Sequence, residues 1–268
     1  FQDEQTGGHF GSMMDRFDQS RSVKILLTNG RHPDGYSPRS ISRWYEFLEF
    51  YVSERIPRLH PLLRTLGAPE FGKSFGMEDA YFEDDRFEDY VDFEDALAVY
   101  EAEPTVRVLF ESGAGQEQPG APEARFSQEY DTWPTPEAEP VQWFLGAEGQ
   151  LQPLASSEAS ADTWRFDPDA GLETFFGPSG YSVLDPLWDI DWTYFEAGDV
   201  AAYLTEPFVE DTVVSGPGYA ELWVKSPVND VTVQVTLSEI RSDGIETYIQ
   251  SGWLRFGHRE ATIGDALR

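Results

Sequence analysis

The fold of the first part of this chain is decided by the stretch Val23-Lys24-Ile25-Leu26-Leu27-Thr28-Asn29-Gly30-Arg31-His32-Pro33-Asp34-Gly35-Tyr36. Residues 23–27 are almost all apolar, which is the pattern of a parallel strand covered on both faces. The dipeptide Asn29-Gly30 and the tripeptide Pro33-Asp34-Gly35 favour turns on either side of His32. The stretch therefore predicts a buried strand followed by a loop that carries one histidine.

The residues after this loop predict a helix. Apolar side chains recur at helical spacing between Ile41 and Ile56, with Ser40 as the expected N-cap and Pro57 as the expected stop. Strand, histidine loop and closing helix is the order in which the catalytic domain of an α/β-hydrolase ends. In that arrangement the histidine lies at the carboxyl end of the last strand and serves as the general base.

The order of the triad in such enzymes is Ser, then Asp or Glu, then His, so the acid should precede His32. Asp3 is the expected acid and Glu4 the competing candidate, since either could accept a hydrogen bond from the imidazole Nδ1 and fix its tautomer. The nearest match to a serine elbow, residues 177–181 around Ser179, lacks the last glycine of Gly-x-Ser-x-Gly. We interpret Ser179 as an ordinary turn residue and expect the nucleophile in sequence upstream of this chain.

Several segments together carry a resemblance to a known family. They are Gln2-Asp3-Glu4-Gln5-Thr6-Gly7, Asn29-Gly30-Arg31-His32, Val106-Arg107-Val108-Leu109-Phe110-Glu111-Ser112-Gly113-Ala114-Gly115, Trp143-Phe144-Leu145, and the longest one, residues 207–255. The chain resembles the cocaine-esterase and Xaa-Pro dipeptidyl-peptidase family of serine hydrolases, in which a C-terminal jelly-roll β-sandwich follows an α/β-hydrolase. The resemblance implies that Asp3 and His32 are triad members and that the substrate is an ester or an Xaa-Pro peptide or amide. It also implies that the chain is a piece of a longer hydrolase whose sandwich continues past Arg268.

Three regions are expected on this basis. Residues 1–57 would be the C-terminal end of the catalytic domain, residues 58–105 an acidic and partly helical connection, and residues 106–268 an incomplete β-sandwich. The predicted fold class is thus an α/β-hydrolase tail (last strand, His loop, closing helix) followed by a mainly β jelly-roll sandwich of the galactose-binding-like type. Carboxylates crowd residues 83–95, where a calcium site is one alternative. The glycine of an EF-hand loop is missing there, so a solvated segment pinned by its aromatic side chains is favoured.

Alternating apolar and polar residues predict the strands of the sandwich. The clearest strand is 231–237, which the turn Asp243-Gly244 would join to a partner at 245–256. Similar patterns predict a first strand at 106–110, a short strand at 141–145 with a turn at 146–149, and a further strand at 219–225.

Composition and net charge limit the classes of partner and of chemistry that are expected for this chain. With 49 acidic against 19 basic residues the net charge is −30, which disfavours nucleic acid as a partner and fits either a solubility device or a high-salt habitat. The absence of cysteine excludes disulfides, thiolate catalysis and zinc–cysteine sites. The sequence has no run of about 18 apolar residues, so no membrane span is predicted. No cofactor or metal is expected. The oligomeric state and the compartment, cytoplasmic or secreted, stay open.

A second class of function competes with the hydrolase. The chain could be a non-catalytic β-sandwich module that binds carbohydrate or mediates assembly. A cluster of aromatic residues around two acids could form a sugar-stacking platform, although packing at a domain interface is the favoured interpretation. Its members are Trp188, Trp192, Tyr194 and Phe195, with Asp189 and Asp191. Residues 1–57 discriminate between the two, because a stand-alone binding module needs no strand, histidine loop and closing helix.

Overall fold

A computed structural model describes residues 9–17, 19–20, 22–30, 32–75, 77, 80–111, 115, 121–169, 198–244 and 246–258. These residues belong to two compact units. The first unit contains the described residues up to Thr135 and those from Pro217 onward, and the second contains the described residues between Pro136 and Gly216.

A three-stranded sheet lies at the centre of the N-terminal part of the first unit. Strand β1 (Ile25–Thr28) pairs in parallel with β2 (Val106–Phe110), and β2 pairs antiparallel with β3 (Phe126–Tyr130). The parallel pairing confirms the prediction made for residues 23–27. The pairing also joins β1, which was predicted for the hydrolase tail, and β2, which was predicted for the sandwich, in one sheet. The sheet therefore contains strands from both of the predicted domains.

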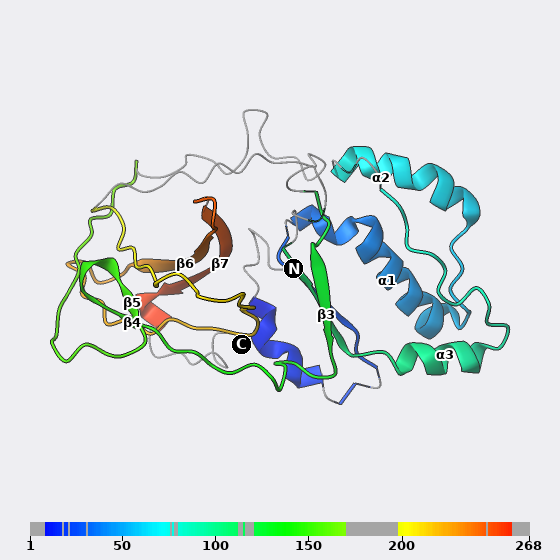
Figure 1. The fold of residues 1–268 in the computed structure, drawn as a ribbon, viewed down its shortest axis with the longest axis horizontal. Helices are drawn as coiled ribbons and strands as arrows, with labels where there is room; N and C mark the ends of the chain where they lie inside the picture. The colour runs from blue at the N-terminus through cyan, green and yellow to red at the C-terminus, as the bar shows by residue number, and fades with distance from the viewer. Residues whose placement is uncertain are drawn as a thin grey trace. The chain divides into compact units, whose positions relative to one another are not determined.

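Helices fill the long crossover that a parallel pair of strands requires. They are η2 (His32–Tyr36), α1 (Pro38–Leu48), η3 (Glu49–Ser53), η4 (Leu63–Gly67), α2 (Ala68–Phe75) and α3 (Phe93–Glu101), and η1 (His9–Phe17) precedes β1. Figure 1 shows α1 and α3 on the same side of the sheet. Helix α3 lies in the connection that was predicted to be partly helical, and it begins at Phe93 because the Asp92 side chain caps it. The helical stretch that includes η4 and α2 was not predicted.

The closing helix begins two residues before its predicted cap. Ser37, not Ser40, is the N-cap residue, with extended backbone at φ −60° and ψ 154°. Ser40 is instead buried inside the helix. The difference arises at Pro38, because proline is favoured at the first helical position, where its missing N–H costs nothing. At the other end the π-turn η3 continues the helix to Glu54, whose left-handed backbone (φ 51°) terminates it before Pro57.

An aromatic core connects α1, η3 and α3 with the acidic segment. The ring of Phe50 lies 5.0 Å from Phe87, edge-on, and 4.8 Å from Tyr100. Phe87 is fully buried and belongs to the acidic stretch 83–95. Among the described residues no group of three or more carboxylates or histidines could hold a metal ion. The buried phenylalanine supports a segment pinned by its aromatic side chains over a calcium site.

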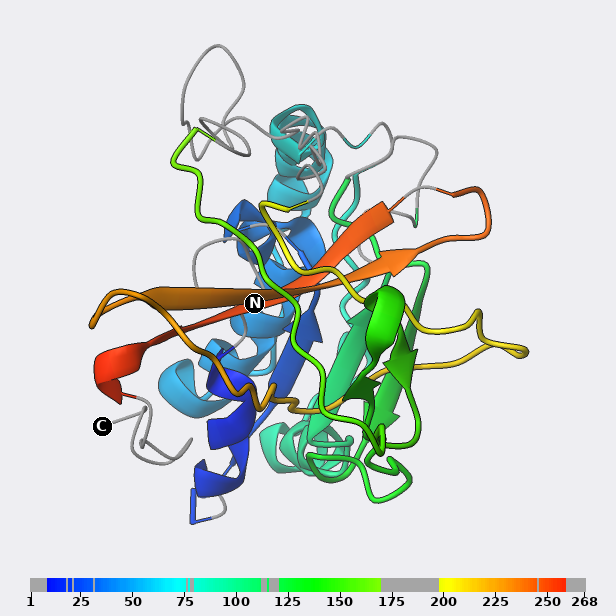
Figure 2. The same ribbon diagram turned by 90° about the vertical axis from the view of Figure 1, so that its left-hand side faces the viewer.

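The C-terminal part of the first unit is a long hairpin (Figure 2). Strand β6 (Thr232–Ile240) pairs antiparallel with β7 (Glu246–Arg255), with an irregularity between Leu237 and Ser238. Gly244 supplies the positive φ of 83° that the turn requires. The hairpin confirms the predicted pair of strands. Most described β6 side chains are exposed, on both faces of the strand.

Within the described residues, the second unit contains one small hairpin. Strands β4 (Phe144–Leu145) and β5 (Leu151–Gln152) flank η5 (Ala147–Gly149), as the turn at 146–149 predicted. The strand predicted at 219–225, in the first unit, is wrong, because these residues form no ladder and Trp223 is 98% exposed. Alternation there has no partner strand within the described residues. The region from β2 to β7 is thus rich in β-strands, and the jelly-roll sandwich stays a prediction.

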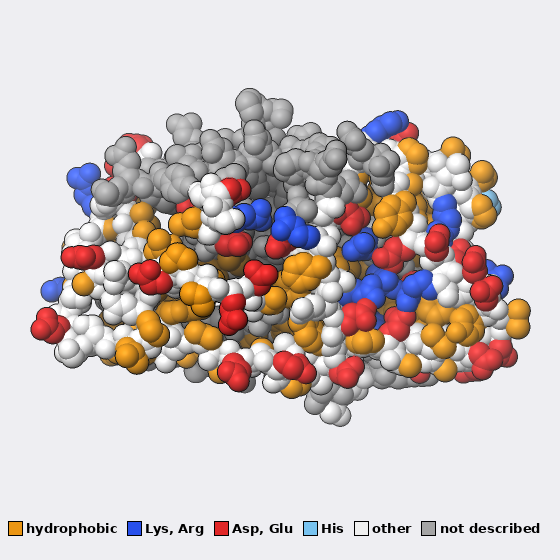
Figure 3. All heavy atoms as spheres, in the orientation of Figure 1, with side chains coloured by type: hydrophobic (Ala, Val, Ile, Leu, Met, Phe, Trp, Pro, Cys, Tyr) orange, Lys and Arg blue, Asp and Glu red, His pale blue; other side chains and the backbone are white. Residues whose placement is uncertain are grey.

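The charged side chains on the surface agree with the acidic composition of the chain. Acidic side chains are scattered over the face drawn in Figure 3, with lysine and arginine side chains among them. Among the described residues, no helix has both the length and the hydropathy that a membrane span would need.

Candidate active site at the end of the first strand

Buried polar residues gather where β1 ends and α1 begins. Thr28 is the last residue of β1, and Asp34, Ser37 and Ser40 follow it through the turn η2 and the start of α1; all four are buried. The carboxyl ends of parallel strands are where open α/β sheets bind their ligands. The predicted histidine, His32, lies in this region, at the start of η2.

Hydrogen bonds join the turn to the helix. The carbonyl of Asp34 accepts hydrogen bonds from the backbone N–H of Ser37 (3.0 Å) and from the Ser40 hydroxyl (3.3 Å). The Ser37 hydroxyl in turn donates to the Ser40 oxygen at 3.3 Å. Beside them Tyr36 contacts Trp44 edge-on, with 6.2 Å between ring centroids. The turn is thus fixed by the first helical residues that follow it.

The predicted triad residues are only partly within the described structure. His32 is the first residue of η2, and its backbone position is described while its side chain is not. Asp3, its competitor Glu4 and the turn residue Ser179 lie outside the described residues. Whether Asp3 reaches His32 therefore remains a prediction. The exposed His60 accepts a hydrogen bond from the Leu62 N–H at its Nδ1 (3.2 Å).

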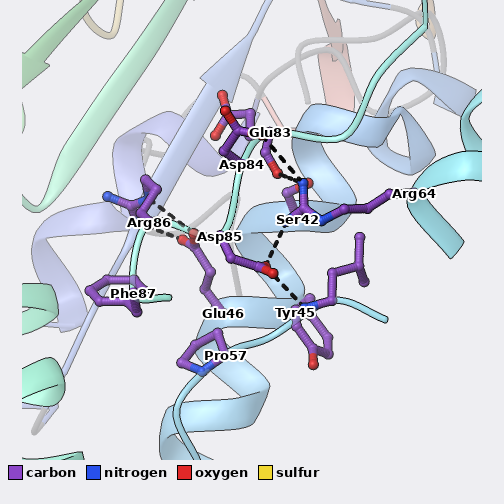
Figure 4. A pocket seen from close by; sticks show the side chains of 11 residues that line it. Ser42, Tyr45, Glu46, Pro57, Arg64, Glu83, Asp84, Asp85, Arg86 and Phe87 are labelled. Carbon is purple, nitrogen blue, oxygen red and sulfur yellow. Dashed lines mark hydrogen bonds and ion pairs between the residues drawn. The ribbon is translucent and has the colours of Figure 1, made fainter. Parts of the chain in front are cut away.

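Sequence reasoning missed a network of ion pairs beside this region. Figure 4 shows side chains of α1 facing those of residues 83–87. The guanidinium of Arg86 binds both carboxylate oxygens of Glu46, with Nε–Oε1 3.0 Å and Nη2–Oε2 2.6 Å, and also contacts Glu103. Burial alone would lower the pKa of Arg86, but its hydrogen bonds to Glu46 and Glu103 raise that pKa above the ordinary value.

The network continues along α1 to Glu123, three residues before β3. Arg43 pairs with Glu46 (3.2 Å) and with Glu83 (2.7 Å), while Arg39 lies 3.6 Å from Glu83 and 3.5 Å from Glu123. Burial raises the pKa of Glu123, against the opposing charge of Arg39. The one signal in the sequence was the spacing of Arg39 and Arg43, which lie four residues apart and so share a helix face.

The cavity drawn in Figure 4 is too small for a substrate. It encloses about 10 Å³, at the lower limit of the space that one water needs. Ion pairs and hydrogen bonds occupy its walls, including Arg64 with Asp85 at 2.6 Å. The network therefore serves to hold the acidic segment against α1.

The second unit has a larger hollow of about 210 Å³. Its lining is mostly small residues and backbone, together with Asp162 and Tyr203. The Tyr203 hydroxyl donates to Asp162 Oδ2 at 2.6 Å. Burial and this hydrogen bond raise the pKa of Tyr203 to about 12, so the phenol keeps its proton at neutral pH.

Comparison with known proteins defines the class. A family model described as the X-Pro dipeptidyl-peptidase C-terminal non-catalytic domain matches residues 98–262, more than half of the chain. The chain therefore belongs to this family, the C-terminal regions of Xaa-Pro dipeptidyl-peptidases and cocaine esterase. The match begins inside α3, so His32 and Asp3 precede it.

One characterised relative can be named. Cocaine esterase of Rhodococcus sp. (strain MB1 Bresler) is 27% identical to this chain over 151 residues, which cover 50% of the chain and 25% of the esterase. The chain thus spans about a quarter of the length of that relative. No solved structure gives a significant match.

Proposed function

We propose that this chain is part of a serine acyl hydrolase that cleaves an ester or an Xaa-Pro peptide or amide bond. Residues 1–57 would supply the end of its α/β-hydrolase domain, residues 58–105 a connection and residues 106–268 the jelly-roll domain. One observation carries the proposal: a strand paired in parallel runs into a turn that opens with His32 and then into α1. Membership in a family of hydrolase C-terminal regions supports it.

The residues of this chain would supply the base and its orienting acid. His32 would take the proton from an upstream serine as that serine attacks the carbonyl carbon, and would then return it to the leaving alkoxide or amine. Asp3 would accept a hydrogen bond from the Nδ1–H of His32 and stabilise the imidazolium that forms. In the second half of the reaction His32 would take a proton from a water molecule as that water attacks the acyl carbon, and would give it to the departing serine oxygen.

Mutation of the complete enzyme tests this mechanism. We expect His32→Ala to lower kcat toward p-nitrophenyl esters or Xaa-Pro p-nitroanilides by about 10⁴-fold or more, with the melting temperature unchanged. His60→Ala is the matched control and should retain full activity, because His60 is exposed and only accepts a backbone hydrogen bond. Full activity of the His32→Ala enzyme would end the proposal. Preference between the two substrate series would identify the substrate class.

The competing function is a carbohydrate-binding or assembly module. The description of the matched family as non-catalytic and the hollow beside Tyr203 and Asp162 favour it. Calorimetric titration with mono- and oligosaccharides, with Tyr203→Phe as the control, distinguishes it from the hydrolase. Saturable binding that Tyr203→Phe weakens, together with an active His32→Ala enzyme, would favour the module.

A further inference from the structure

The turn after β1 contains a buried acid that the proposed mechanism does not use. Asp34 is only 5% exposed, although acidic side chains are rarely buried to this extent. Its Oδ2 lies 2.6 Å from the point where a Cβ on residue 30 would stand, and its Cγ lies 3.3 Å from that point. The carboxylate therefore packs directly on Gly30, and any larger residue at position 30 would displace it.

The main chain of the same residue holds the far end of the turn. The Asp34 carbonyl accepts from Ser37 N–H at 3.0 Å and from the Ser40 hydroxyl at 3.3 Å, both at the start of α1. Asp34 thus connects Gly30, at the exit of β1, with the first turn of the helix. His32 lies between Gly30 and Asp34, two residues from each.

We propose that Asp34 is a positioning residue for His32. Its side chain against Gly30 and its carbonyl against α1 fix the backbone from which the imidazole projects. This inference rests on the proposed function, because it takes His32 as the general base. A displacement of about 1 Å at a catalytic group can cost about 10²-fold in rate, so a rigid turn matters to kcat more than to substrate binding.

The complete enzyme tests the role through kcat and KM measured separately. Asp34→Ala should lower kcat by about 10- to 100-fold and leave KM within about threefold. Asp34→Asn has the same shape and should restore kcat to within about threefold of wild type. Asp84→Ala is the matched control and should change neither constant, because the Asp84 side chain is fully exposed.

The same substitution in an enzyme that lacks His32 separates a role in positioning His32 from a general role in stabilising the fold. In an enzyme that already carries His32→Ala, the residual activity comes from the oxyanion hole and binding, so Asp34→Ala should reduce it no further. Gly30→Ala adds a Cβ 2.6 Å from Oδ2 and should lower kcat alone, but much less when combined with Asp34→Ala. Such non-additivity reports direct contact between the two positions.

The outcomes distinguish the two proposals. If Asp34→Ala lowers the residual activity of His32→Ala as strongly as it lowers wild type, Asp34 acts on the fold and this inference is overturned, while the loss caused by His32→Ala still supports the hydrolase. If His32→Ala is fully active, the proposed function fails first. If Asp34→Ala does not fold, the kcat of the Gly30→Ala enzyme decides: unchanged kcat overturns the inference.

Discussion

Replacing Arg86 by methionine would break the ion pairs that hold the acidic segment on α1. The substitution keeps an unbranched side chain of similar length but removes the guanidinium, whose carbon lies 5.0 Å from the centroid of the Phe87 ring. It removes both hydrogen bonds to Glu46, whose side chain is 8% exposed, and the contact with Glu103. Glu46 would then keep Arg43 as a cationic partner at 3.2 Å.

The expected loss follows from these surroundings. Removing one partner of a fully buried pair costs about 3–5 kcal/mol. Here Arg86 is 28% exposed and Arg43 remains, so solvent and the second arginine recover part of the loss, and we expect about 2–3 kcal/mol. For a protein of this size that lowers the melting temperature by roughly 4–12 °C. Thermal unfolding followed by near-ultraviolet circular dichroism measures it.

Two further variants make the result specific. Lys73→Met breaks a pair with Glu70 that is 72% and 71% exposed, and should change stability by less than about 0.5 kcal/mol. Glu46→Gln, added to Arg86→Met, removes the buried charge left behind and should recover part of the lost stability. An Arg86→Met protein as stable as wild type, or no recovery in the double variant, would refute the reasoning.

Three other predictions concern stability. With a net charge of −30, raising salt from about 0.05 to 1 M should raise the melting temperature by screening self-repulsion; a flat dependence would contradict this. Burial raises the pKa of Glu123 above its ordinary 4.5. The protonated Glu123 carboxyl therefore contributes stability that is fully present below pH 4.5 and is lost as the pH rises through the raised pKa of the folded protein. Glu123→Gln should therefore be more stable relative to wild type at pH 7 than at pH 4, as denaturant titrations at the two pH values would show, and an equal difference at both would contradict it. Asp92→Ala removes an N-cap that accepts hydrogen bonds from Glu94 N (2.9 Å) and Asp95 N (3.2 Å) and should cost about 1 kcal/mol; chemical unfolding measures this loss, with Asp89→Ala as the exposed control.

Local patterns in the sequence predicted the elements that depend on neighbouring residues. The apolar run 23–27 marks β1, and the alternation from Val231 with Asp243-Gly244 marks the β6–β7 hairpin, because strand period and turn chemistry are local. The start of α1 was misplaced because the apolar pattern begins at Ile41, whereas proline at position 38 sets the backbone three residues earlier. The stretch of η4 and α2 was missed because Gly67 and Pro69 interrupt it, and both disfavour helix interiors.

Interactions between distant residues could not be predicted in this way. Glu46, Arg86 and Glu103 are far apart in the sequence, and no periodicity relates them. The burial of Asp34 depends on the absence of a side chain at Gly30, which the sequence shows only as a common turn residue. For the site, the sequence identified the histidine loop and the structure added the residues that hold it. Asp3 and its pairing with His32 stay a prediction.

The pairing of β1 with β2 determines where this chain can be truncated. The family match begins at residue 98, so a piece trimmed there would contain β2 and β3 but not β1. Residues Val106, Val108 and Leu109 are buried in the intact protein, and in the trimmed piece their strand would become an edge with unsatisfied backbone groups. Edges of this kind template pairing with other chains and lead to aggregation. A soluble piece would have to begin upstream of Ile25.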